Sequence, residues 1–356
     1  MTRLDALRGQ IEAEGLDAVL ISDPINRRYL SGFTGSAGWL LVTAERTLLI
    51  LDYRYYERAA REAPAWEQVR VATTHEDALF EAARDLGIGH LGVEGDHLTV
   101  SQYGRLQEGL PGVTLAPLDK LVLTMRQVKG EGELGKIRAA VRCADQAWAH
   151  LCQVIHPGMR EDGAAWALES HMRQHGASAV SFPTIVGSGP NGAMPHATAG
   201  DRLLREGEPI VIDFGALVDG YCSDITRTIC LGTPDEHYLE LWHLVLETQA
   251  HVEAQLRPGM TAKEADALAR DRFVAAGYGD AFGHGLGHGV GLAIHEEPFL
   301  SRRGDDTILS PGMVLTVEPG LYLPGWGGVR IEDMVVLREE GAEVLTQAPK
   351  EPLVPA

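Results

Sequence analysis

The sequence is short of positive charge and of long apolar runs. Lys and Arg number 31 against 50 Asp and Glu, which gives a formal net charge of −19. So acidic a chain repels a phosphate backbone, and we expect no nucleic-acid partner. No apolar run approaches the ~20 residues that span a bilayer, so we expect no membrane association either.

Two further patterns, a CxxC pair and a signal peptide, are not expected from the sequence. The first residues lack the apolar core of a signal peptide, and no two cysteines have the CxxC spacing. We therefore expect a cytoplasmic protein whose thiols are reduced and buried as small apolar side chains. The four are Cys143, Cys152, Cys222 and Cys230.

At 356 residues the chain exceeds what one core usually organises, so we expect two domains. Short apolar runs at 18–21 and 47–51 alternate with a helically spaced stretch at 76–86, which predicts an α/β layer domain over residues 1–122. A second domain is expected over residues 123–356, beginning near a long helix.

The second domain contains an internal duplication. A helical stretch ends in His-Pro-Gly-Met at 156–159, and another ends in Arg-Pro-Gly-Met at 257–260. Each is followed by a second helix that ends at a glycine, Gly176 or Gly277. Two copies of helix, helix and strands predict an α+β domain with a pseudo-two-fold axis.

The duplication places four acids in equivalent positions. Asp213 and Glu318 each end an aliphatic run, and each run is followed by a turn and a second strand that carries Asp224 or Glu332. Hairpin return would bring the acids together near the axis. Singly, each acid is more simply explained as a solvated strand residue.

Four buried carboxylates at contact distance repel one another, so they must be protonated or neutralised by cations. Two divalent ions neutralise four carboxylates. Oxygen ligands with one imidazole suit Mn²⁺, Co²⁺ or Zn²⁺.

The imidazole is expected from the glycine-spaced run 283–296, which carries His284, His288 and His295. Its glycines make a helix expensive, at ~1 kcal/mol each, so an extended segment is predicted. His295 and Glu296 are not followed by the second His of an HExxH helix, which excludes that single-zinc motif.

A separate GxGxxG match at 187–192 contains Pro190, which prevents the helix that a dinucleotide site requires. We interpret it as a loop leading to His196. No GxSxG or Cys-His nucleophile pattern is present.

Together these motifs resemble the Xaa-Pro peptidase branch, prolidases and aminopeptidases P, of the dinuclear "pita-bread" metallopeptidases. The resemblance covers the whole chain and implies a creatinase-like N-terminal domain before the catalytic one. The segments that carry it are 211–215, 221–228, 284–296, 318–322 and 328–333.

By this resemblance, Asp213 would chelate one ion, His288 and Glu318 the other, and Asp224 and Glu332 would bridge both. The implied reaction is hydrolysis of the Xaa-Pro bond by a metal-bridging hydroxide. Mn²⁺ is the expected metal, with Co²⁺ or Zn²⁺ as alternatives, and relatives are commonly homodimers.

The resemblance also implies roles around the metals. Glu318 would shuttle the proton to the leaving nitrogen, and His196 and His295 would contact the scissile region and steady the oxyanion. Arg330 would orient the carboxylates from outside the ligand shell.

Four functions fit this architecture: a dipeptidase (prolidase), an aminopeptidase P acting on longer peptides, a metal-free creatine hydrolase and a non-catalytic peptide-binding module. The intact ligand set argues against the last two. We favour the dipeptidase, whose substrate offers a free carboxylate to an arginine fork. The N-terminal domain offers Arg27, Arg46 and Arg54 as candidates.

Overall fold

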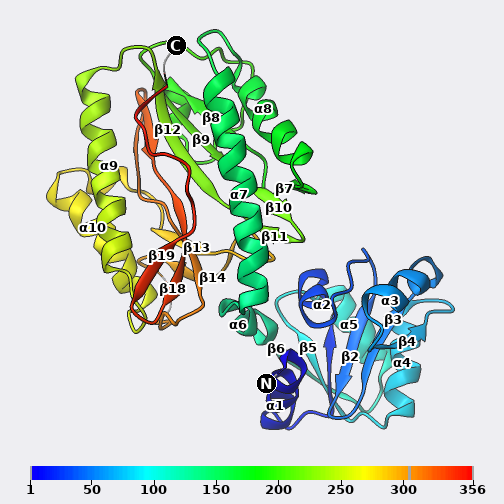
Figure 1. Cartoon of the computed structure of the whole chain (residues 1–356). Helices are drawn as coiled ribbons and strands as arrows, with labels where there is room; N and C mark the ends of the chain where they lie inside the picture. Colours follow the sequence, from blue (N-terminus) through cyan, green and yellow to red (C-terminus); the bar gives the residue numbers. More distant parts are fainter. Residues whose placement is uncertain (1, 304–305, 355–356) are drawn as a thin grey trace. The chain divides into compact units, whose positions relative to one another are not determined.

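The computed structural model describes residues 2–303 and 306–354, and the chain divides into two compact units after Arg126 (Figure 1). The helix α6 (Leu121–Gln127) spans this division, and the boundary expected from the sequence at residue 122 lies near its start. Each unit has an apolar core of its own.

The first unit is an α/β layer built on a six-stranded sheet of order β4-β3-β2-β1-β5-β6. Its strands are β1 (Ala18–Ile21), β2 (Trp39–Thr43), β3 (Thr47–Leu51), β4 (Glu67–Arg70), β5 (His90–Glu94) and β6 (Thr114–Leu118). Its helices are α1 (Arg3–Ala13), α2 (Pro24–Ser31), α3 (Tyr56–Glu62), α4 (His75–Asp85) and α5 (Val100–Gly109), with a 3₁₀ turn η1 (Tyr53–Tyr55).

Local chemistry explains where these elements begin and end. The apolar runs at 18–21 and 47–51 become β1 and β3 with the bounds expected from the sequence. Thr74 caps α4 by accepting a hydrogen bond from the backbone of Asp77.

The second unit has four long helices in two pairs. They are α7 (Glu131–Val154) with α8 (Glu161–Gln174), and α9 (Glu236–Gln255) with α10 (Ala262–Ala275). The two pairs flank the strands on opposite sides (Figure 1). Two 3₁₀ turns are η2 (Gly189–Ala193) and η3 (Gly279–Ala281).

The helix pairs repeat one local structure, which confirms the internal duplication. Gly158 and Gly259 have φ of +87° and +88°, and their amides donate to the carbonyls of Leu204 and Leu309 at the same distance of 2.8 Å. A positive φ is easily adopted only by glycine, so the Pro-Gly-Met signature marks a required turn in both copies.

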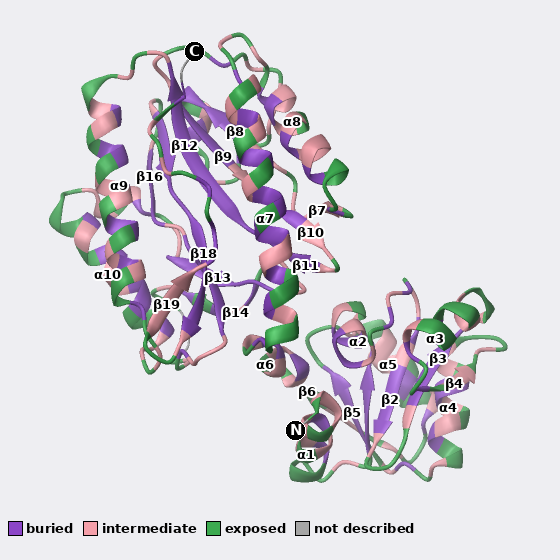
Figure 2. Ribbon diagram, in the orientation of Figure 1, coloured by how far each residue is buried: buried purple, intermediate pink, exposed green. Residues whose placement is uncertain are grey.

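The strands of the second unit form two main sheets, of orders β20-β12-β9-β8 and β14-β13-β15-β18-β19, and two small ones, β11-β10-β7 and β16-β17. The colouring in Figure 2 shows most of these strands buried. The strands are β7 (Ala179–Val180), β8 (Ile185–Ser188), β9 (Pro209–Phe214), β10 (Ala216–Val218), β11 (Tyr221–Cys222), β12 (Ile225–Leu231), β13 (Gly287–Gly289), β14 (Glu296–Leu300), β15 (Val314–Val317), β16 (Gly320–Leu323), β17 (Gly327–Arg330), β18 (Asp333–Arg338), β19 (Gly341–Val344) and β20 (Leu353–Val354).

Antiparallel register brings the four acids to equivalent strand ends. Strand β9 pairs with β12 so that Asp213 faces Thr226, and β15 pairs with β18 so that Val317 faces Asp333. In each copy a short hairpin, β10–β11 or β16–β17, lies between the paired strands. The sequence led us to expect that each strand is followed directly by its partner. A short hairpin lies between them instead, but the paired strands still bring the acids together.

Candidate metal centre

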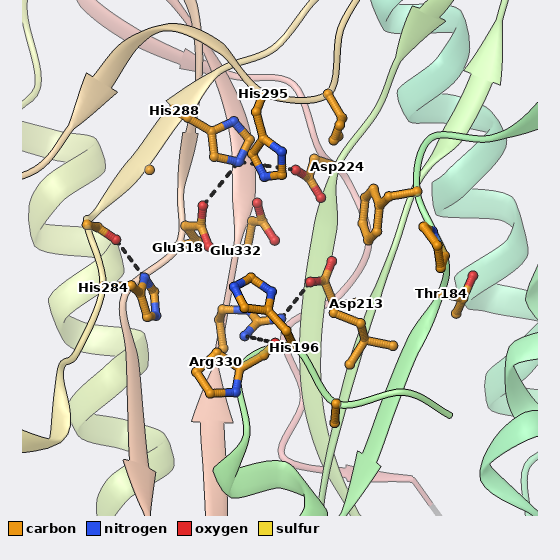
Figure 3. A pocket seen from close by; sticks show the side chains of 18 of the residues that line it. Thr184, His196, Asp213, Asp224, His284, His288, His295, Glu318, Arg330 and Glu332 are labelled. Atoms are coloured by element: carbon orange, nitrogen blue, oxygen red, sulfur yellow. Dashed lines mark hydrogen bonds and ion pairs between the residues drawn. The ribbon is translucent and has the colours of Figure 1, made fainter. Parts of the chain in front are cut away.

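The second unit contains a pocket of about 580 Å³, and all the acids and histidines expected at the site line it (Figure 3). Its wall is otherwise largely apolar, with Phe182, Ile294 and Phe299 among the lining residues. The expected residues at the pocket are His196, Asp213, Asp224, His288, His295, Glu318, Arg330 and Glu332.

Five potential ligands converge in this pocket. Asp213, Asp224 and Glu332 each offer a carboxylate oxygen, and these oxygens all lie within 4.8 Å of one another. Nε2 of His288 lies 3.6 Å from Oδ2 of Asp224 and 3.4 Å from Oε1 of Glu318. The structure thus brings together the residues that the sequence singled out as metal ligands.

The orientation of His288 fits a cation. Its Nδ1 lies 3.0 Å from the carbonyl oxygen of Gly289, which can only accept, so Nδ1 carries the proton and Nε2 presents a lone pair. Burial lowers the pKa of His288 to about 4, so the ring is neutral. A lone pair aimed at two ionised carboxylates is unfavourable unless a proton or a cation lies between them.

The surroundings of the carboxylates also favour a bound cation. Burial, followed by repulsion from Glu332, raises the pKa of Asp224 well above its usual range, and burial raises that of Glu318 to about 7. Oδ1 of Asp213 is buried and makes no hydrogen bond within the described part of the chain. Acids held this way require protons or cations, and the donor set fits divalent metals.

Glycine makes the close approach of His288 possible. Residue 287 precedes it in β13, and a Cβ at that position would lie 2.2 Å from the backbone oxygen of Thr316. Strand β13 could not approach β15 this closely with any other residue there. The glycine-spaced run is extended here, as the sequence predicts.

Arg330 is hydrogen-bonded to a candidate ligand. Its Nη2 donates to Oδ2 of Asp213 at 2.6 Å, and its Nη1 donates to the hydroxyl of Tyr322 at 2.6 Å. Its Nε donates to Thr226, whose own hydroxyl donates to Oε2 of Glu332. Arg330 is therefore placed to fix carboxylates from both halves of the domain.

His196 and His295 face the same space. The ring of His295 lies 4.3 Å from that of His288, and His196 lines the pocket beside Asp213 and Arg330 (Figure 3). His196 follows the turn η2, so the GxGxxG segment forms a strand end and a 3₁₀ turn rather than a dinucleotide-binding helix.

The three arginines of the first unit have different surroundings. Arg27 is buried, and its guanidinium donates to the carbonyls of Gly35 and Gly38, which gives it a structural task. Arg46 pairs with Glu67, and Arg54 pairs with Asp52. These last two side chains remain about half exposed, at 46% and 59%.

Sequence reasoning missed several residues that support the site. Thr316 donates to Oε1 of Glu318 and accepts from the backbone of His288. Glu161, fully buried, accepts hydrogen bonds from Ser188 and Asn191 and so holds the loop that leads to His196. Thr316 lies two residues before Glu318, and this spacing was a usable signal because it places both side chains on the same side of an extended segment. Glu161 gave no such signal.

Comparison with known proteins agrees with this geometry. The family model "Metallopeptidase family M24" matches residues 135–339, and the model "Creatinase/Prolidase N-terminal domain" matches residues 3–128. The "Xaa-Pro dipeptidase" of Pyrococcus furiosus is 38% identical over 98% of this chain and 99% of its own length.

Two solved structures are also similar over nearly the whole chain. The "Xaa-Pro dipeptidase from Bacillus anthracis" is 42% identical, with a TM-score of 0.96 and 98% of both chains covered. The "X-Pro aminopeptidase from Thermotoga maritima" is 39% identical, with a TM-score of 0.91, and covers 98% of this chain and 100% of its own.

Fold and site define a metallopeptidase with an α/β N-terminal domain and a pita-bread catalytic domain. The chain belongs to metallopeptidase family M24. The expected family and fold class are thereby confirmed. Peptidases of this family use divalent metals, and this chain carries a matching carboxylate cluster. None of the helices in the described ranges combines the length and apolar character of a membrane span.

Proposed function

We propose that this protein is a dinuclear metal-dependent prolidase that hydrolyses the Xaa-Pro bond of dipeptides. The single observation that carries the proposal is the convergence of four carboxylates and the Nε2 lone pair of His288 in one pocket. The names of the relatives from Pyrococcus furiosus and Bacillus anthracis support the substrate class.

In this proposal five side chains hold two divalent ions. Asp213 would hold one ion, His288 and Glu318 would hold the other, and Asp224 and Glu332 would contribute to both sites. Two such ions would supply Lewis acidity, which would polarise a carbonyl and lower the pKa of water.

The remaining steps belong to the side chains of this chain. Burial raises the pKa of Glu318 to about 7, which suits a group that takes a proton at neutral pH and returns it to the leaving nitrogen. His196 and His295 donate hydrogen bonds to the oxygen on which charge develops. The apolar wall of the pocket limits the access of bulk water.

The preferred length of the substrate depends on how the free carboxylate of a dipeptide is bound. Arg330 is the only Lys or Arg among the described residues that line the pocket, and it already binds Asp213 and Tyr322. A dipeptide carboxylate would therefore need another cation, and we propose an arginine of the first unit. Cleavage of longer peptides is the alternative, and the Thermotoga maritima relative named as an aminopeptidase favours it.

The test compares initial rates on an Xaa-Pro dipeptide and the matching Xaa-Pro-Yaa tripeptide, with Mn²⁺, Co²⁺ and Zn²⁺ supplied separately to metal-free protein. We expect the dipeptide to be cleaved faster. Faster cleavage of the tripeptide would move the function to aminopeptidase P, and cleavage that is unaffected by metal removal would overturn the metal centre.

We also propose Mn²⁺ as the working metal, a homodimer as the assembly and the cytoplasm as the location. Oxygen ligands with a single imidazole suit Mn²⁺. The cysteines Cys143, Cys152, Cys222 and Cys230 are free, as a reducing compartment requires. Metal analysis of protein purified from its source cell and a sedimentation measurement test the first two proposals.

A further inference from the structure

Arg227 makes an unusually complete set of contacts directly behind the metal centre. It is 2% exposed, and its guanidinium makes five hydrogen bonds. The acceptors are the carbonyls of Thr226 (3.0 Å), Glu332 (2.5 Å), Ala348 (2.7 Å) and Pro349 (3.1 Å) and Oδ1 of Asp333 (2.8 Å).

These acceptors come from three parts of the chain. Thr226 is the residue whose hydroxyl donates to Glu332, and Glu332 is a proposed bridging ligand whose backbone Arg227 holds. Asp333 is the next residue and is fully buried. Ala348 and Pro349 lie in the segment 346–354, which contributes no residue to the pocket.

The segment 346–354 is itself firmly held. The carboxylate of Asp145 in α7 accepts from the amides of Gln347 and Ala348. Lys350 forms ion pairs with Asp333 and with Glu253. Further along, the carbonyl of Pro352 accepts from Cys230, and β20 pairs with β12.

We propose that Arg227 is a positioning residue of the metal centre and that the segment 346–354 completes it by supplying the acceptors that fix its guanidinium. The inference rests on the proposed metal centre, not on the peptide specificity. Arg227 holds the backbone on which the Glu332 side chain is mounted, and the segment keeps Arg227 in place.

The physical reason is the cost of an unpaired buried cation. A buried guanidinium must have its N–H donors hydrogen-bonded, and removal of acceptors leaves some donors unpaired at a cost in free energy. The acceptors that remain include the backbone carbonyl of Glu332, so loss of the segment would loosen the guanidinium that holds this proposed ligand. Residues that support metal ligands from outside typically change metal affinity by 10–100-fold.

The test measures metal affinity of metal-free protein by competition with a chelator, alongside thermal unfolding of the metal-free form. Arg227→Lys keeps the charge but has no fork to serve five acceptors, and we expect roughly 10–100-fold weaker metal binding. The matched control is Arg270→Lys. Arg270 is also buried, pairs with Asp266 and bonds the carbonyls of Phe282 and His284, but it contacts none of the proposed ligands.

We expect Arg270→Lys to lower the unfolding temperature comparably while keeping metal affinity within about threefold. Asp145→Ala, which removes hydrogen bonds to the segment but none of the hydrogen bonds of Arg227, should weaken metal binding in the same direction. In the double variant Arg227→Lys with Asp145→Ala, the fold loss of metal affinity should be smaller than the product of the two single losses. The reason is that both substitutions remove the same constraint.

Unchanged metal affinity in Arg227→Lys would overturn the proposal, and so would an equal loss in Arg270→Lys, which would reduce the effect to general destabilisation. Full additivity of Arg227→Lys and Asp145→Ala would separate the segment from Arg227 and also refute it. The readout involves no peptide, so a protein that binds metal as expected but does not cleave Xaa-Pro bonds would refute only the proposed function.

Discussion

Nε2 of His288 lies 3.4 Å from Oε1 of Glu318. His288 lies in β13, and Glu318 directly follows β15. Thr316 links them further, since its hydroxyl donates to Glu318 and accepts from the backbone of His288. The imidazole of His288 and the carboxyl group of Glu318 are thus held in fixed positions, with the Nε2 lone pair facing the carboxyl group. This arrangement distinguishes His288 from the other histidines of the pocket.

His288→Ala is expected to lose metal, whereas His295→Ala and His196→Ala should retain it. The last two variants should slow turnover by roughly 10²–10³-fold, the usual effect of removing one donor to a developing oxyanion. Metal content by elemental analysis, set against kcat, separates the two kinds of residue. If all three variants kept two equivalents of metal, His288 would not be a ligand.

Asp224→Asn should lower bound metal and abolish hydrolysis, because it removes one charge from a proposed bridging position. The fold should survive, since repulsion among buried acids is also relieved. Arg330→Ala is the companion variant and should cost less, roughly 10–100-fold in metal affinity or activity. Circular dichroism checks the fold. An active, metal-free Asp224→Asn protein would refute the metal centre.

The metal-free protein should become less stable as pH rises. Burial raises the pKa of Glu318 from 4.5 to about 7, so between these values the folded state binds a proton that the unfolded chain has released. That stabilisation is complete below pH 4.5 and is lost as pH rises through 7, on the order of 3 kcal/mol for this group. Bound metal should remove the trend, because protons compete with it for the ligands.

The test is the stability to unfolding at pH 5 and pH 8, with and without metal. The stability compared is that of the unfolding transition that shifts when metal is added. Glu318→Gln is the control, because an amide cannot ionise and the metal-free slope should become shallower. A metal-free protein that is more stable at pH 8 than at pH 5 would contradict the prediction.

The sequence predicted much of the site because its acids occupy equivalent places in a visible duplication. Asp213 and Glu318 end matching strands, and pairing then determines where Asp224 and Glu332 lie. The contacts of Arg227 could not be predicted in this way, because they join a central strand to a distant segment with no motif.

The substrate arginine was the least determined expectation. Nothing in the sequence distinguishes Arg27, Arg46 and Arg54, but the structure gives them different surroundings. A guanidinium used within the domain, as that of Arg27 is, leaves little for a ligand. The half-exposed side chains of Arg46 and Arg54 keep donors near solvent.

We therefore predict that one of the two single variants, Arg46→Ala or Arg54→Ala, weakens dipeptide cleavage while sparing tripeptides. The other single variant should change neither. Both arginines form exposed ion pairs, which contribute little to stability, so each variant is the matched control for the other. A lost bidentate contact to the substrate carboxylate should cost about 1.5–3 kcal/mol in transition-state stabilisation, measured from kcat/KM.

Arg27→Ala should behave differently. It leaves the carbonyls of Gly35 and Gly38 without their buried donor, so it should lower the unfolding temperature and affect dipeptides and tripeptides alike. The ratio of kcat/KM for the two substrates is thus the decisive quantity, because a change in folded fraction cancels from it. If neither Arg46→Ala nor Arg54→Ala changes that ratio, the free carboxylate is not read by these arginines, and the preference for dipeptides loses its proposed cause.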